Sequence, residues 1–239
     1  MNRISMGSRG FGEACVIERV EARGIKYNTG ISKPENCEVV IVSSDSVRRL
    51  KNLEGNVLNP RKRRFFGGRR TDPNDYVIFF MDSAFHEASW GGNVLYKNDR
   101  NGGSREKVNI RATFSFRIVR GDRTLSLLSE TQSKYPRRYM IDKIRALMDN
   151  TAKAYVCGTL SDIGFTSAQQ NTFKLSERIQ ERLNCDVLSN VGVTMFNLNL
   201  HLEEDEEFAT MNTERERSTS VEAEKDNTKY YDNEMGEKE

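Results

Sequence analysis

The chain has 239 residues, of which 36% are hydrophobic and 30% charged, and no stretch approaches the roughly 20 apolar residues of a membrane-spanning helix. Its formal charge of +2 conceals an asymmetry, because residues 203–239 hold fourteen acidic against five basic residues, which leaves +11 on residues 1–202. A basic body with an acidic tail favours an anionic partner, such as a membrane surface or nucleic acid, or a tail that shields the body until a partner arrives.

The cysteines and the N-terminus narrow the class of protein further. Cys15, Cys37, Cys157 and Cys185 stand far apart, without a C-x-x-C pair or a histidine at ligand spacing, which disfavours a disulfide framework and a zinc site. The N-terminus lacks the apolar region of a secretory signal. We expect a cytoplasmic protein without a metal or cofactor, which at most rests on a membrane.

Short strands are predicted in the N-terminal third. The first dozen residues are polar and rich in glycine, so we expect a flexible segment over residues 1–10 and order from residue 11. Residues 37–42 are a run of β-formers that follows Pro34 and precedes turn residues. The apolar run at residues 76–81 is too short for an ordinary helix and predicts a strand covered on both faces.

Between these strands lies a basic loop with two aromatic side chains. Such a loop can dock on anionic lipid, each cation contributing about 1 kcal/mol near the surface while the rings enter the interface. The same chemistry makes phosphate and stacking contacts with nucleic acid, and a third interpretation is a solvated loop whose rings tuck into the domain. The candidate contact residues for a membrane or another anionic partner are Arg61, Lys62, Arg63, Arg64, Phe65, Phe66, Arg69 and Arg70.

The clearest periodicity of the chain is at residues 108–118, where apolar and polar side chains alternate strictly. A period of two predicts a half-buried strand whose register is fixed, because a slip of one residue would turn the whole apolar set to water. Upstream of it, after Trp90-Gly91-Gly92, residues 94–96 predict a further short strand.

Two helices are predicted next. Pro136 suits the first position of a helix that Gly158 stops, and apolar residues at three- and four-residue spacing give that helix one buried face. A second helix over residues 173–184 carries its apolar stripe at Leu175, Ile179 and Leu183.

The C-terminal part changes from apolar to acidic. The strand expected at residues 191–202 changes phase along its length, which predicts either a bulge near Met195 or burial of each face in turn. Residues 203–217 then predict a charged helix whose first carboxylates oppose the positive end of the helix dipole. Residues 218–239 form an acidic tail with the composition of disorder.

Four segments carry a family resemblance in their order and spacing. They are the strand at residues 33–42 after a Pro-containing turn, residues 79–82 with the corner Trp90-Gly91-Gly92, the alternating strand 108–118, and the helix and Gly-led strand of residues 175–198. Together they resemble the SPFH, or band-7, family of stomatin, prohibitin, flotillin and HflK-C, and most of all its soluble bacterial branch without a transmembrane anchor. Gly92 stands where that branch usually has threonine.

The resemblance covers roughly residues 11–208 and implies both a fold and a function. The implied fold is α+β, an SPFH domain over residues 11–202 in which small antiparallel sheets are packed by two or three helices. Members of the family self-associate into membrane-bound scaffolds and have no catalytic residues, so we expect a non-catalytic homo-oligomer that organises partner proteins at a membrane surface or on a membrane-embedded partner. Phe208 and Met211, the apolar residues of the charged helix, are the candidates for subunit contact.

Two other classes of protein are alternatives to a scaffold. A nucleic-acid-binding module would use the same basic loop at residues 61–70, although no recognition helix, ribonucleoprotein motif or zinc finger accompanies it. A hydrolase would need a nucleophile or an acid/base pair that the sequence does not display. His86-Glu87 lacks the second histidine of an H-E-x-x-H metal helix, and His86 and His201 are expected to be surface or strand-edge residues.

Overall fold

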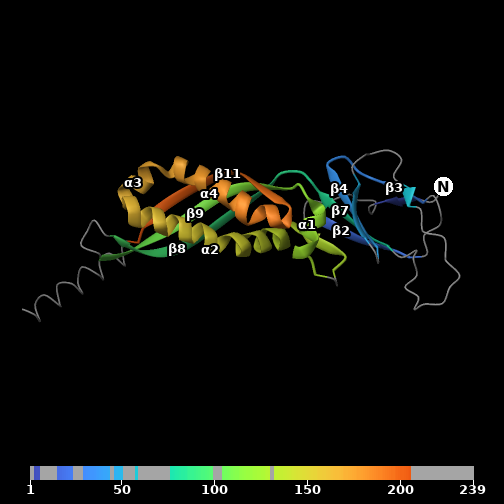
Figure 1. Cartoon of the computed structure of the whole chain (residues 1–239), viewed down its shortest axis with the longest axis horizontal. Coiled ribbons are helices and arrows are strands. Elements are labelled where there is room, and N and C mark those ends of the chain that lie inside the picture. The colour runs from blue at the N-terminus through green and yellow to red at the C-terminus, as the bar shows by residue number, and fades with distance from the viewer. Residues whose placement is uncertain are drawn as a thin grey trace, which may run out of the picture. The chain divides into compact units, whose positions relative to one another are not determined.

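The structure, a computed structural model, describes residues 3–5, 15–23, 29–43, 46–50, 57–58, 76–98, 104–129 and 132–205. Strands and helices combine in an α+β arrangement, as the sequence predicts (Figure 1). The described residues form two compact units, the first within Met1–Trp90, Thr113–Ala152 and Ser176–Asn199, the second within Gly91–Ala112, Lys153–Leu175 and Leu200–Glu239. Among the described residues, no helix is both long enough and apolar enough to cross a membrane.

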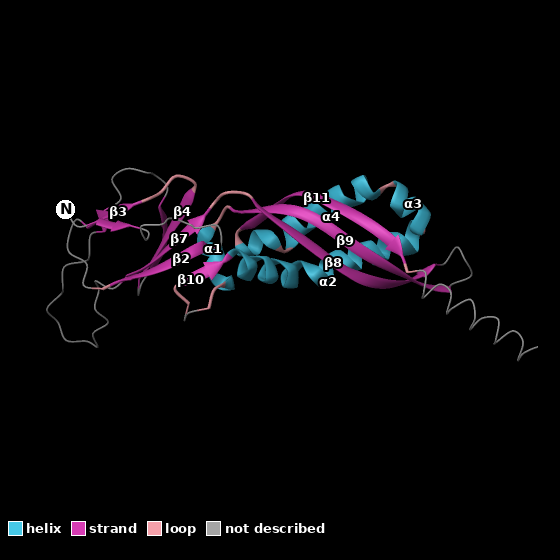
Figure 2. Ribbon diagram, turned by 180° about the vertical axis from the view of Figure 1, so that it is seen from behind, coloured by secondary structure: helices cyan, strands magenta, loops and turns pink. Residues whose placement is uncertain are grey.

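A five-stranded sheet in the first unit has the order β10-β2-β7-β4-β5, and each neighbouring pair is antiparallel (Figure 2). The strands are β2 (Cys15–Ala22), β4 (Cys37–Ser43), β5 (Ser46–Leu50), β7 (Tyr76–Asp82) and β10 (Lys134–Pro136). The predicted strands at residues 37–42 and 76–81 are confirmed. β7 lies at the centre because its apolar run needs cover on both faces, and Ile78, Phe80 and Met81 are wholly buried.

The apolar core of this sheet is built around β4 and β7, two of its three inner strands. Val39 and Ile41 of β4 pack with Ile78 and Phe80 of β7, and Ala22, Ile31, Cys37 and Tyr76 complete the cluster. Each fully buried large apolar side chain contributes about 1.5–3 kcal/mol. The β4–β7 pair is therefore a firm frame for the turns at its ends, where the Ser83 N–H donates to the carbonyl of Asn36 at 2.8 Å.

A small sheet forms next to the N-terminus, with the order β1-β3-β6. Its strands are β1 (Arg3–Ser5), β3 (Thr29–Ser32) and β6 (Val57–Leu58). The structure differs from the sequence prediction in two ways here. Residues 3–5 form a strand within a segment expected to be flexible, and β1 pairs with β3 in parallel although antiparallel sheets are expected. Main-chain pairing orders so short a strand, and nothing in its composition signals either the pairing or its direction.

A second three-stranded sheet, of order β11-β9-β8, is formed by β8 (His86–Asn98), β9 (Ser104–Ile118) and β11 (Val193–Glu204). The predicted alternation of β9 is confirmed, because its apolar positions from Val108 to Ile118 are buried. The prediction of a corner at Trp90-Gly91-Gly92 is wrong, because these residues lie inside the continuous strand β8. A Cβ at Gly91 would come within 2.9 Å of the Ile110 carbonyl oxygen, so glycine permits the close approach of β8 to β9.

The extent of the helices agrees better with their apolar stripes than with the positions of glycine and proline. They are α1 (Gly121–Thr124), α2 (Arg137–Ile163), α3 (Phe165–Gln170) and α4 (Thr172–Asp186), with 3₁₀ turns η2 (Leu125–Leu127) and η3 (Leu188–Val191). The stripe of α4 at Leu175, Ile179 and Leu183 is buried as predicted.

The predicted ends of α2 are wrong. Pro136 ends strand β10, where it pairs with Cys15, and the helix begins one residue later. Gly158 lies within the helix, because burial of Val156 and Leu160 continues the stripe and outweighs the roughly 1 kcal/mol that a mid-helix glycine costs. The helix ends before Gly164, whose φ of 79° no other residue adopts easily.

β11 changes phase as predicted, two residues beyond the expected position. Val193 and Met195 are buried, then Leu198, Leu200 and Leu202, and Asn197 between the two sets has a positive φ of 53°. Figure 1 shows α4 running along this strand, and two of its amide side chains bond the strand's backbone. Asn184 accepts from the Met195 N–H at 2.7 Å and donates to the Met195 carbonyl at 2.9 Å, while Gln180 accepts from the Leu198 N–H at 2.9 Å.

The start of the expected charged helix also differs. Glu203 and Glu204 continue strand β11 instead of opening a helix. Cross-strand contacts explain the extension, because Glu203 pairs with Arg111 at 3.3 Å and Asp205 pairs with Lys107 at 2.8 Å. The Asp205 N–H also donates to the Lys107 carbonyl at 3.0 Å.

Candidate functional site

The contact residues predicted from the sequence lie outside the part of the chain that the structure describes. This holds for Phe208 and Met211 and for the whole basic loop, Arg61, Lys62, Arg63, Arg64, Phe65, Phe66, Arg69 and Arg70. Their role therefore stays a prediction from the sequence. Of the two histidines, His201 is exposed as expected, and His86 opens the outer strand β8, which agrees with the strand-edge alternative, although its side chain is buried.

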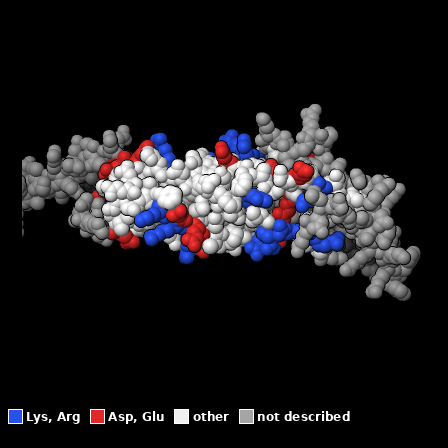
Figure 3. Space-filling model, turned by 90° about the horizontal axis from the view of Figure 1, so that it is seen from above, with Lys and Arg blue, Asp and Glu red and all other residues white. Residues whose placement is uncertain are grey.

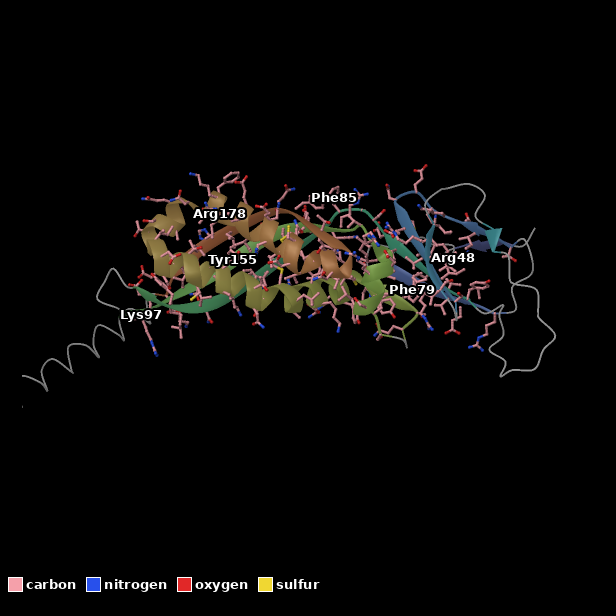
Figure 4. All side chains as sticks on the ribbon, in the orientation of Figure 1. Arg48, Phe79, Phe85, Lys97, Tyr155 and Arg178 are labelled. Atoms are coloured by element: carbon pink, nitrogen blue, oxygen red, sulfur yellow. The ribbon has the colours of Figure 1, made fainter. Side chains whose placement is uncertain are left out.

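The described structure brings together three side chains that the sequence analysis did not connect. Phe85, between β7 and β8, packs edge-to-face on Phe196 of β11, with ring centroids 5.2 Å apart and an interplanar angle of 76°. The Arg117 guanidinium of β9 lies over the Phe85 ring, 5.7 Å from its centroid. We call these three residues the Phe85 cluster. Phe85 is 58% exposed, and Figure 4 labels it at the surface of the ribbon.

A tight turn presents Phe85 to solvent. Asp82 ends β7 and accepts a hydrogen bond from the Ala84 N–H at 2.9 Å, a side-chain contact that stabilises a bend at this position. The neighbouring Ser83 is tied to Asn36 through its backbone. Because the start of the turn is anchored in the β4–β7 frame, the ring is held at the surface although its apolar area would favour burial.

The chemistry of the Phe85 cluster suits recognition of another protein surface. An edge-to-face aromatic pair contributes about 0.5–1.5 kcal/mol beyond its buried area, and an exposed cation–π contact about 0.5–1 kcal/mol. Both contacts pre-order the side chains, so a partner that covers them loses less conformational entropy. Aromatic residues and arginine are also the types enriched in the energetic centres of protein interfaces.

Sequence reasoning missed this cluster because its members come from three elements. The alternation of β9 does place Arg117 on the polar face of the strand, and Phe85 is an apolar residue directly after a turn. Neither signal names a partner. Only the pairing of β9 with β11, at the point where β11 changes phase, brings Phe196 beside them.

A buried carboxylate braces the strands behind this surface. Glu38 of β4 is 8% exposed and accepts hydrogen bonds from Arg49 Nε and, at 2.9 Å, from the N–H of Gly121, which opens α1. Arg49 also lies 3.6 Å from Asp122. The hydrogen bond and charge of Arg120, with the charge of Arg49, lower the pKa of Asp122. These ion pairs join the β4–β5 edge to the start of α1.

The remaining titratable groups of the described residues include the buried His86. Burial lowers the pKa of His86 despite Asp82, whose Oδ2 lies 3.5 Å from Nε2, and Nε2 makes no hydrogen bond to the described residues. Among those residues, no three His, Cys, Asp or Glu side chains are placed to hold a metal ion. On the face that Figure 3 shows, basic and acidic side chains stand beside one another.

Comparison of the chain with protein-family models finds no match, and comparison with curated proteins finds none either. The functional proposal therefore depends on the resemblance of the four segments and on the geometry of the Phe85 cluster.

Proposed function

We propose that the protein is a non-catalytic SPFH-type scaffold that self-associates and organises partner proteins at a membrane. The observation that carries the proposal is the exposed Phe85 cluster, a pre-ordered aromatic and arginine surface. The order of elements supports it, because the segments that resemble the family fold as the strands β4, β7 and β9 and the α4–β11 pair. In this proposal the occupant of the Phe85 cluster is a second copy of the chain.

Self-association is tested by measuring the mass of the full chain by light scattering over a range of concentrations. Truncating a central interface aromatic costs about 2 kcal/mol, so Phe85→Ala should weaken association by about 30-fold. Phe173→Ala is the matched control, because Phe173 on α4 is 74% exposed and has no aromatic or cationic stacking partner among the described residues. A monomer at every concentration, or equal weakening by both variants, would contradict the proposal.

Subunit contact through the C-terminal segment is a separate part of the proposal. Phe208→Ser with Met211→Ser should lower the measured mass if the segment contributes a second contact. The effect should add to that of Phe85→Ala, because two independent contacts contribute independent free energies. An unchanged mass in the double variant would remove these two residues from the interface.

Membrane engagement is proposed for the basic loop. The full chain should co-sediment with anionic vesicles and not with neutral ones, and the binding should weaken as salt is raised. Arg63→Glu with Arg64→Glu should abolish it, whereas Lys174→Glu with Arg178→Glu, the same charge change on exposed positions of α4, should not. Loss in both double variants would show that net charge alone drives binding. Salt-sensitive binding to oligonucleotides in place of vesicles would favour the nucleic-acid-binding module.

A further inference from the structure

A cavity of about 430 Å³ opens in the first unit, beside the edge of the five-stranded sheet. Its walls come from β4, β5, the end of β9 and the turns that precede β4 and follow β7. The volume lies within the range of about 300–1,000 Å³ that small-molecule sites occupy. The proposed membrane contact does not use this cavity, and the Phe85 cluster shares one residue with it, Arg117.

The lining of the cavity is strongly cationic. Lys33, Arg49 and Arg117 line it together with one carboxylate, that of Glu38. Arg49 is committed to Glu38, and its Nη2 donates to the Val119 carbonyl at 2.9 Å. Lys33 and Arg117 form no ion pair with a carboxylate of the described residues. Two positive charges thus remain uncompensated in the lining.

The other groups of the lining add no negative charge and supply an apolar wall. Cys37 is 3% exposed, and burial raises the pKa of its thiol to about 12, so the thiol is neutral at physiological pH. Leu50, Ile118 and Val119 provide the apolar part of the wall. A ligand that matches this lining has a compact double negative charge at one end and an organic body at the other.

We propose that this cavity binds a phosphomonoester, with Lys33 and Arg117 on the phosphate dianion and the apolar wall against the organic group. Lysine and arginine are the side chains best suited to phosphate oxygens, arginine through paired N–H donors. The cavity of about 430 Å³ is large enough for an organic group beside the phosphate.

The test is calorimetric titration of the full chain with phenyl phosphate at pH 8, where a second phosphate pKa near 6 leaves the ester a dianion. Inorganic phosphate, benzenesulfonate and phenol are titrated in parallel. Phenyl phosphate should bind at least tenfold more tightly than inorganic phosphate, which lacks the organic group, and than the monoanion benzenesulfonate. Phenol should give no binding.

Lys33→Met is the deciding variant, and Arg117→Met supports it. Each should weaken phenyl phosphate binding at least tenfold while the circular dichroism spectrum is retained, because both side chains reach solvent. Arg48→Met, an exposed neighbour on β5 that does not line the cavity, is the matched control and should leave binding unchanged (Figure 4). Phe85→Ala should also keep binding, which separates this site from the self-association surface.

Three results would overturn the proposal. One is the absence of binding heat with phenyl phosphate in the wild-type chain. Another is equal affinity for benzenesulfonate, which would exclude recognition of a dianion. The last is an equal loss in Arg48→Met and Lys33→Met, which would show a general attraction to a basic surface instead of a site.

Discussion

Removal of the Glu38 carboxylate should lower the free energy of unfolding of the first unit by more than the loss of one hydrogen bond, because this carboxylate accepts two. Glu38→Ala leaves two donors without their acceptor, the Nε–H of Arg49 and the backbone N–H of Gly121. Glu38→Gln can keep an oxygen acceptor in the place of Oε1, while it removes the charge and replaces the other oxygen with an NH2 group. The pair of variants therefore separates the loss of the acceptor from the loss of the ion pair.

The expected magnitude follows from the exposure of the partners. A hydrogen bond to a charged group contributes about 1.5–3 kcal/mol, and a buried donor left unpaired costs about 1–3 kcal/mol. The Arg49 side chain is 32% exposed and 3.6 Å from Asp122, so it can turn to water or to that carboxylate, and its share lies at the low end. We expect a loss of about 3 kcal/mol for Glu38→Ala and about 1 kcal/mol for Glu38→Gln.

Urea unfolding followed by the fluorescence of Trp90 is the appropriate assay. Trp90 is the single tryptophan of the chain, is 6% exposed and belongs to the same unit as Glu38. The midpoint should fall while the dependence on urea concentration is unchanged. Glu35→Ala, an exposed carboxylate in the preceding turn, should stay within about 0.5 kcal/mol of wild type. A loss below about 1 kcal/mol for Glu38→Ala, or equal losses for both Glu38 variants, would refute the reasoning.

Three further outcomes are expected. Gly192→Ala should lower the melting temperature far more than Gly164→Ala, because both glycines have positive φ but only the Cβ at Gly192 would meet a backbone carbonyl oxygen, at 2.0 Å; equal shifts would contradict this. Burial lowers the pKa of His86, so stability should be full above the unfolded pKa of about 6.5 and fall as the pH drops below it; His86→Leu should flatten this part of a pH-dependent melting curve. In native protein iodoacetamide should modify exposed Cys185 and spare Cys37, whose thiol is buried with a pKa of about 12, as peptide mass mapping would show.

Local patterns predicted the elements whose burial is regular. The alternation of β9 predicts a strand with one buried face, and the apolar run of β7 predicts a strand buried on both faces. The existence and type of both elements therefore follow from the residues alone. Glycine was the less reliable signal. Gly158 lies inside α2, where it faces solvent while the apolar stripe of the helix continues past it. Gly91 lies inside β8, where it adjoins the backbone of the neighbouring strand β9. Both reasons are tertiary, and a linear pattern does not contain them.

The candidate site was much less predictable than the fold. The Phe85 cluster joins positions 85, 117 and 196, which only strand pairing brings together. The cavity is similar, since Lys33 and Arg117 belong to a turn and to a strand end far apart in the chain. A single sequence shows each cation alone, as one more solvated charge, and the uncompensated pair is visible only when Arg49 is seen to be occupied by Glu38.

The amide side chains of α4 have a consequence for how copies of the chain can meet. β11 is an outer strand of its sheet, and an open strand edge invites another chain to add a strand there. Asn184 and Gln180 already bond the backbone of Met195 and Leu198, so the helix acts as a surrogate strand over this stretch. These hydrogen bonds occupy backbone groups of β11 at Met195 and Leu198, so another chain cannot add a strand to β11 at these positions. In the proposed self-association, side chains such as Phe85 make the contact instead of this stretch of β11, and side chains can separate without disrupting a sheet.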